Sequence, residues 1–154
     1  MIKYLFAMQR EADMIDVPNK YIIGINGTDM PTTTKDDILV NLGYCGAYDI
    51  KVGTIVEPSD VFCRKPRGKK HINKKFGVDR VRCYTSNEFV TKPFVKFPSI
   101  YDMELYKIAL LPHKKIYSLK IVSDNLNEQD CEQFNDKECW NKVKELLILN
   151  NLML

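Results

Sequence analysis

The feature that most constrains the fold is the alternation of short β-branched runs with helical or turn-rich segments along the 154 residues. Residues predicted to form strands are 2–8, 20–25, 38–44, 51–58, 80–85 and 115–124. Helices are predicted over 102–111, where Pro112 ends the helix, and after Asn135, which has Glu138 at the capping-box position. The alternation predicts an α/β fold, and the length predicts a single domain, 1–154.

The cysteine and histidine content argues against disulfides and against a metal centre. Five cysteines form no C-x-x-C pair, and His71 and His113 are the only histidines. We therefore expect free thiols in a reducing compartment and no metal ligand set. The N-terminal apolar run is too short for a secretory signal or a membrane span. These features predict a cytoplasmic protein with no cofactor and no membrane contact.

Positive charge is concentrated between Arg64 and Arg82, where nine Lys or Arg stand against the single acid Asp79. Such a run is most often a solvated loop, and otherwise a site for anions or nucleic acid. Phe76 is the only aromatic residue inside the run, which weakens an interpretation based on base stacking. The run keeps nucleic-acid binding open as an alternative function.

Carboxylates and glycines occur where predicted elements begin or end. Glu11 follows the first strand, the glycine turn 43–47 follows the third, Asp124 ends the last strand, and Glu104 lies at the start of a helix. Because ligands bind beyond the carboxyl ends of strands in open α/β sheets, we expect these places to share one rim. Asp102, also at that helix start, is expected to complement the helix dipole instead.

Three carboxylates beside a glycine turn suit the cleavage of an N-glycosidic bond to a purine. The transition state is a cationic sugar that leaves a base in need of a proton, so carboxylates can protonate, stabilise charge and activate water. Other interpretations stay open from the residues alone. Glu11 can be a surface acid, and Asp124 can cap a turn, since Ser-Asp-Asn is good turn chemistry.

Five motifs, in this order, resemble those of the purine nucleoside phosphorylase and nucleosidase superfamily. They are FAMQREA (6–12), VNLGYCGAYDIKVGTIVEPSD (40–60), SNEFV (86–90), YDMELYKIA (101–109) and IVSDN (121–125). The sequence is most similar to 5′-methylthioadenosine/S-adenosylhomocysteine (MTA/SAH) nucleosidases, as a shortened member. The resemblance implies a compact three-layer αβα sandwich with a mixed central sheet, acting on a small purine nucleoside as a homo-oligomer, with a dimer favoured.

The resemblance also implies roles for the carboxylates. Glu11 positions or activates the hydrolytic water, and Asp124 assists protonation of the purine N7 and reads the exocyclic amine. Met103 and Glu104 hold the ribose, with Glu104 accepting hydrogen bonds from its 2′ and 3′ hydroxyls. The expected catalytic residues are therefore Asp124 and Glu11.

The remaining substrate contacts follow from the same resemblance. Phe89 stacks on the base, the backbone of Val90 pairs with its edge, and Phe134 touches the 5′ substituent. Gly43 and Tyr44 border the substrate. Tyr44 stands where a small Ser or Thr is usual, so its bulk is expected to fill part of the nucleophile subsite.

The residue at position 41, Asn41, is the feature that distinguishes hydrolysis from phosphorolysis within the resemblance to this superfamily. Related phosphorylases usually carry an Arg at this place, two residues before the glycine turn, to bind phosphate. The resemblance therefore implies water as the nucleophile and a purine nucleosidase as the function. The alternatives are a degenerate nucleoside- or nucleotide-binding protein without catalysis, and a nucleic-acid binder that uses the run 64–82.

Overall fold

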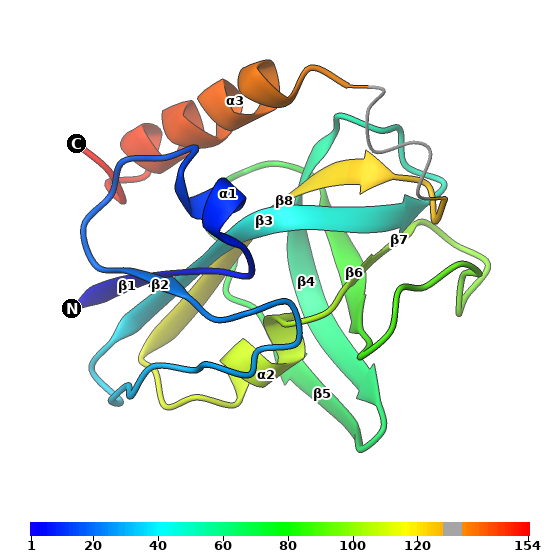
Figure 1. Ribbon diagram of the computed structural model, residues 1–154, viewed down its shortest axis with the longest axis horizontal. Coiled ribbons are helices and arrows are strands. Elements are labelled where there is room, and N and C mark those ends of the chain that lie inside the picture. The colour runs from blue at the N-terminus through cyan, green and yellow to red at the C-terminus, as the bar shows by residue number, and fades with distance from the viewer. Residues whose placement is uncertain (128–133) are drawn as a thin grey trace.

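The computed structural model describes residues 1–127 and 134–154, and its strands belong to one mixed sheet (Figure 1). The strands are β1 (Ile2–Phe6), β2 (Lys20–Ile22), β3 (Ile38–Tyr48), β4 (Ile55–Arg64), β5 (Arg67–His71), β6 (Arg80–Thr85), β7 (Ser99–Asp102) and β8 (Lys115–Asp124). The helices are α1 (Gln9–Ala12), α2 (Leu105–Ala109) and α3 (Asp136–Leu149).

Five of the strands form a closed ring. β3 pairs with β8, β8 with β4, β4 with β6, β6 with β7, and β7 returns to β3. The length of β3 makes the closure possible, because one of its edges pairs with β8 while the other pairs first with β1 and then with β7. In Figure 1, β1 and β2 extend beyond the ring, and β5 continues from β4. The sheet is therefore barrel-like.

The barrel-like sheet differs from the three-layer sandwich expected from the sequence, which is not confirmed. The strand that closes the ring, β7, lies just before the segment predicted to be a helix, and it pairs antiparallel with β3 and parallel with β6. Closure satisfies strand edges that an open sheet would leave unpaired. The coarser expectation of a mixed α/β fold with a central sheet is confirmed.

Alternation along β3 builds a core on each face of the sheet. Val40 and Leu42 pack in one cluster with Trp140 of α3. Leu39 precedes Val40, so its side chain lies on the opposite face of β3, where it packs in a second cluster with Leu105 of α2. Figure 1 shows α3 lying over one side of the sheet and α2 on the other. This period-two pattern decides which side chains of β3 and β8 point into the ring.

The two predicted helices have different outcomes. α3 is confirmed: the side chain of Asn135 accepts a hydrogen bond from the N–H of Glu138 at 3.1 Å, as the capping pattern predicted. The helix expected over 102–111 is shorter, since α2 begins only at Leu105 and Asp102 ends β7 in extended backbone. Met103 therefore lies between a strand and a helix.

The basic run 64–82 contains a strand, in contrast to the solvated loop that its composition favoured. Arg67–His71 forms β5, which pairs antiparallel with β4. None of the helices in the described part of the chain has the length and apolar character that a bilayer span requires. The four described cysteines are free thiols, and Cys131 lies outside the described residues.

Candidate functional site

Glu11 reaches the middle of β3 at Gly43. The glycine turn expected over 43–47 is not a turn, because these residues continue the strand β3. It lies in α1, directly after β1, and only 1% of it is exposed. Its Oε1 accepts a hydrogen bond from the N–H of Met8 and its Oε2 one from the N–H of Tyr44, both at 2.9 Å. A Cβ at Gly43 would lie 2.5 Å from this Oε2. The absent side chain of Gly43 therefore makes the space for the carboxylate.

A fully buried lysine binds two more carboxylates. Lys120 of β8 places Nζ 2.6 Å from Oε1 of Glu104 and 3.1 Å from Oδ2 of Asp102. Its neighbours Leu119 and Ile121 pack in the cluster under α3, so alternation along β8 turns Lys120 to the opposite face, into the ring. Sequence reasoning missed Lys120. The available signal was a lysine between two apolar residues, Leu119 and Ile121, in the middle of a predicted strand.

The electrostatics of this cluster favour a retained proton. Burial raises the pKa of Glu11, and it raises the pKa of Glu104 to about 7 although Lys120 acts in the opposite direction. Burial also lowers the pKa of Lys120, but the charges of Glu104 and Asp102 outweigh this and hold that pKa well above its usual value. One ammonium does not balance three ionised carboxylates in a buried site. With a pKa of about 7, Glu104 is therefore partly protonated near neutral pH.

Asp102 serves the helix start as expected and has a second role. Its Oδ2 accepts a hydrogen bond from the N–H of Leu105 at 2.9 Å, in the first turn of α2. Its Oδ1 accepts one from the hydroxyl of Thr85 at 2.6 Å. Together with the ion pair to Lys120, these contacts fix the carboxylate from three sides. Asp102 therefore anchors the buried charge cluster as well as α2.

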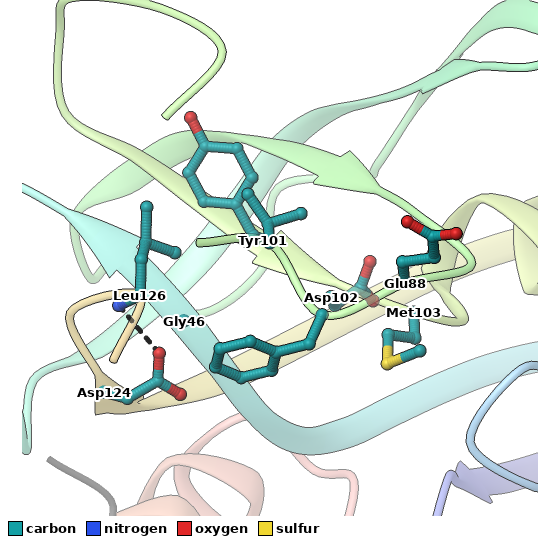
Figure 2. A pocket seen from close by; sticks show the side chains of 9 residues that line it. Gly46, Glu88, Tyr101, Asp102, Met103, Asp124 and Leu126 are labelled. Carbon is teal, nitrogen blue, oxygen red and sulfur yellow. Dashed lines mark hydrogen bonds between the residues drawn. The ribbon is translucent and has the colours of Figure 1, made fainter. Parts of the chain in front are cut away.

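A small cavity of about 30 Å³ opens beside this cluster, where β7 joins β3 (Figure 2). Its lining consists of Gly46, Glu88, Phe89, Val90, Tyr101, Asp102, Met103, Asp124 and Leu126. Four residues predicted from the sequence are thus brought to one cavity, namely Phe89, Val90, Met103 and Asp124. Tyr101 and Leu126 are lining residues that sequence reasoning did not single out.

Asp124 faces this cavity and also organises the turn after β8. Its Oδ1 accepts a hydrogen bond from the N–H of Leu126 at 2.8 Å, the dashed line in Figure 2. The hydroxyl of Ser123 donates to its Oδ2 at 3.2 Å. The turn-capping role that the sequence left open is therefore present. Asp124 therefore caps the turn and lines the cavity at the same time.

Glu104 does not line the cavity but adjoins it. Its Oε2 accepts a hydrogen bond from the N–H of Met103 at 3.2 Å, and Met103 is a lining residue. Asp102 belongs to both places, since it lines the cavity and pairs with Lys120. The cavity and the buried charge cluster therefore form one continuous site.

Tyr44 and Phe134 lie against α3. The Tyr44 hydroxyl donates a hydrogen bond to Asp136 and accepts one from Nε1 of Trp140 at 2.9 Å. The Tyr44 ring meets that of Phe134 edge-on, with centroids 6.2 Å apart. Tyr44 contributes its backbone N–H to Glu11, while its side chain packs among residues of the α3 cluster. Neither ring is among the residues that line the cavity.

Position 41, which the sequence comparison used to distinguish hydrolysis from phosphorolysis, holds a buried neutral amide. Asn41 donates to the carbonyl oxygen of Leu5 at 3.2 Å, and its Oδ1 accepts from the hydroxyl of Ser118 at 3.0 Å. Its polar atoms are thus engaged within the sheet. Among residues 1–127 and 134–154, no three His, Cys, Asp or Glu side chains are grouped so as to hold a metal ion.

The fold of this chain is shared with solved structures of enzymes that cleave nucleosides. In particular, the chain has the fold of MTA/SAH nucleosidases. It superimposes on the MTAN protein of Chlamydia trachomatis bound to MTA with a TM-score of 0.76, at 15% identity, covering 99% of this chain and 98% of the other. This likeness confirms, at the level of the fold, the resemblance carried by the sequence motifs.

Two further solved structures support the same fold. The 5′-methylthioadenosine nucleosidase of Arabidopsis thaliana, in its apo form, matches with a TM-score of 0.73 at 14% identity, over 97% of this chain and 95% of the other. A putative MTA/SAH nucleosidase of Borrelia burgdorferi bound to adenine matches with a TM-score of 0.71 at 16% identity, over 97% and 100%. No protein-family model and no curated protein matches the sequence.

Proposed function

We propose that this protein hydrolyses the N-glycosidic bond of purine nucleosides of the MTA/SAH type. The observation that carries the proposal is the convergence of Phe89, Val90, Met103 and Asp124 on one cavity, beside the buried carboxylate of Glu104. The solved structures with this fold that contain MTA or adenine support the substrate class.

The purine base is assigned to the wall formed by Phe89 and Val90. An aromatic ring beside a backbone segment can stack on the base while N–H and C=O groups pair with its edge. Asp124 lies on the same cavity, and in this proposal it assists protonation of N7. Adenine leaves far more easily once it has gained a proton, so this step is general acid catalysis.

The ribose is assigned to Glu104 and Met103. Lys120 holds Oε1 of Glu104 and the N–H of Met103 holds Oε2, so the carboxylate has a fixed orientation before substrate binds. In its ionised form it can accept hydrogen bonds from the ribose hydroxyls and stabilise the cationic sugar. Because the Glu104 carboxylate is already oriented, it does not have to change its position during the reaction.

The hydrolytic water is assigned to Glu11. Burial raises the pKa of this carboxyl, which brings it closer to the range in which a general base works at neutral pH. The neutral, fully engaged amide of Asn41 offers no charge to a phosphate ion. Water therefore fits the nucleophile position better than phosphate.

The substrate requires the cavity to open. A volume of about 30 Å³ is comparable to the share of one liquid water molecule, and it is too small for a nucleoside. Phe89 is 41% exposed, so its ring can rotate outward without breaking a packed core. We assign to Phe89 both the opening of the cavity and the stacking on the base.

Adenine release from MTA and SAH tests the proposal directly. Purified protein is incubated with each nucleoside, and products are separated by liquid chromatography with and without added phosphate. The proposal predicts free adenine at a rate that phosphate does not change. Nucleoside binding by calorimetry without any adenine release would instead identify a binding protein that lacks catalysis.

A homodimer is part of the proposal, because the resemblance to nucleosidases implies one. Sedimentation velocity across protein concentrations, with turnover measured at the same concentrations, tests this part separately. A monomer that releases adenine at the full rate would overturn the dimer and leave hydrolysis intact.

A further inference from the structure

A broad groove with a different chemistry lies beside the β4–β5 hairpin. Its volume is about 680 Å³, within the range of ligand-binding clefts. Its lining includes Phe62, Arg64, Arg67, Lys69, Tyr84 and Phe94, and it shares no residue with the cavity at Asp124. We refer to these six residues as the cationic groove.

Aromatic rings hold the cations of this groove in place. The guanidinium of Arg64 lies 4.4 Å from the centroid of the Phe94 ring, and Nζ of Lys69 lies 5.8 Å from that of Phe62. Arg82 beside the groove lies between two rings, 4.7 Å from Phe62 and 5.0 Å from Phe97. A guanidinium stacked on a ring keeps its in-plane N–H donors for a phosphate or carboxylate. The cations are thus positioned before any anion arrives.

Carboxylates do not neutralise the two groove arginines. Lys69 lies 3.8 Å from Asp60, but neither Arg64 nor Arg67 forms an ion pair with any described residue. Charge is also segregated along the chain. Residues 62–97 contain eleven Lys or Arg and two acids, whereas the rest of the chain contains twelve Lys or Arg and eighteen acids. This asymmetry is the electrostatic signature of a surface for a polyanion.

The fold supplies the aromatic residues that the basic run lacks in sequence. Phe62 comes from β4, Tyr84 from β6, and Phe94 and Phe97 from the segment before β7. Phe97 is 42% exposed, so one ring beside Arg82 is available to a further ring. Unpaired bases stack on such rings, while a duplex keeps its bases stacked within itself.

From these observations we infer that the cationic groove binds single-stranded nucleic acid through its phosphates. A second copy of this chain is disfavoured as the occupant, because a two-fold interface would bring this positive surface against its own equivalent. The groove is also independent of the proposed hydrolysis, since the two sites share no lining residue. Failure of one proposal therefore leaves the other standing.

The test measures binding of a fluorescent 20-nucleotide oligothymidylate by the full chain, between about 50 and 200 mM salt. The parent is compared with the double variant Arg64→Gln/Arg67→Gln. The matched control is Lys114→Gln/Lys115→Gln, which removes the same charge at two exposed positions away from the groove. Loss of two phosphate contacts should reduce the salt slope by about 1.4, at roughly 0.7 per contact for single strands. The control should keep the parent slope, and all three proteins should release adenine equally.

The variant Phe97→Ala tests whether the aromatic rings contribute to oligothymidylate binding in addition to the positive charges. It should weaken oligothymidylate binding at least about fivefold, at the low end for loss of a stacking contact, with no change of net charge. Equal weakening by the groove variant and its lysine control would overturn the inference, because the effect would then belong to net charge. It would also be overturned by equal affinity for a duplex of the same length, or by ATP binding that matches the oligonucleotide with a shallow salt slope. Self-association that the arginine variant abolishes would assign the groove to a second copy instead.

Discussion

Nζ of Lys120 lies 2.6 Å from Oε1 of Glu104, and both side chains are buried inside the closed ring. The two residues come from β8 and from the start of α2, so their ion pair joins the sheet to the segment that carries Met103. Nζ also lies 3.1 Å from Asp102, which makes Lys120 the common partner of two acids. Its ammonium should therefore matter more for the site than any single carboxylate.

Removal of this ammonium should destabilise the protein strongly. Lys120→Met leaves Asp102 and Glu104 buried without their cation, which should lower the free energy of unfolding by about 3 to 5 kcal/mol at pH 7. The loss should shrink near pH 4.5, where the carboxyls can take up protons. Urea unfolding at both pH values measures this, with Lys120→Arg as the control that keeps a positive charge. An equal loss at both pH values would show that packing, not charge, is responsible.

Glu104 should make stability fall as pH rises. Burial raises its pKa to about 7 from the usual 4.5, so between these values the folded chain binds a proton that the unfolded chain has released. The stabilising contribution is complete below about pH 4.5 and is lost as pH rises through about 7, on the order of 3 kcal/mol in total. Glu104→Gln should flatten the unfolding free energy over this interval. A parent curve that rises between these pH values, with no change in the variant, would contradict the raised pKa.

A methyl group at Gly43 of β3 should stop hydrolysis while sparing the base site. In Gly43→Ala the new Cβ would lie 2.5 Å from Oε2 of Glu11, so the carboxylate must leave its bonds to Met8 and Tyr44. We expect turnover of MTA to fall at least about a hundredfold, within the range for loss of a general base. Calorimetry should show adenine affinity within about twofold of the parent. Parent-like turnover would remove Glu11 from the water site.

Asp124→Asn should reduce hydrolysis without unfolding the chain. Asparagine can still accept the hydrogen bond from the N–H of Leu126 but cannot supply a proton to the base, so we expect at least about two decades of rate to be lost. Asp16→Asn, which makes the same change at an exposed acid, is the control. Circular dichroism checks that the fold persists. If Asp124→Asn hydrolyses MTA at the parent rate, its role at N7 is wrong.

The strands that sequence patterns predicted best are those with apolar or β-branched side chains. Residues 80–85 and 115–124 coincide with β6 and β8, and in β8 nearly every side chain is buried. β5 was missed because Arg67–His71 shows no apolar alternation. Backbone pairing with β4 holds this largely exposed strand in place. β7 was missed because only four residues precede a helical pattern. Both strands depend on pairing partners that local patterns do not reveal.

The site was predicted where local motifs identify it and missed where long-range pairing builds it. Phe89, Val90, Met103 and Asp124 belong to short motifs, and they meet at one cavity. Lys120 was missed because its function depends on the ring, which brings β8 next to the start of α2. The aromatic rings around the cationic groove were missed for the same reason, since they come from separate segments.

The pairing of β3 with β7, which we call the seam, closes the ring and also forms part of the cavity wall. Ligand binding and ring closure are therefore thermodynamically coupled. Gly46 and Tyr101 are paired across this seam, and both line the cavity. The cavity therefore exists only in chains whose ring is closed, so a molecule that fills it stabilises the closed form by mass action. Occupancy at a hundred times the dissociation constant adds about 2.7 kcal/mol to the free energy of unfolding. The ligand concentration therefore also sets the fraction of chains in which the ring is open.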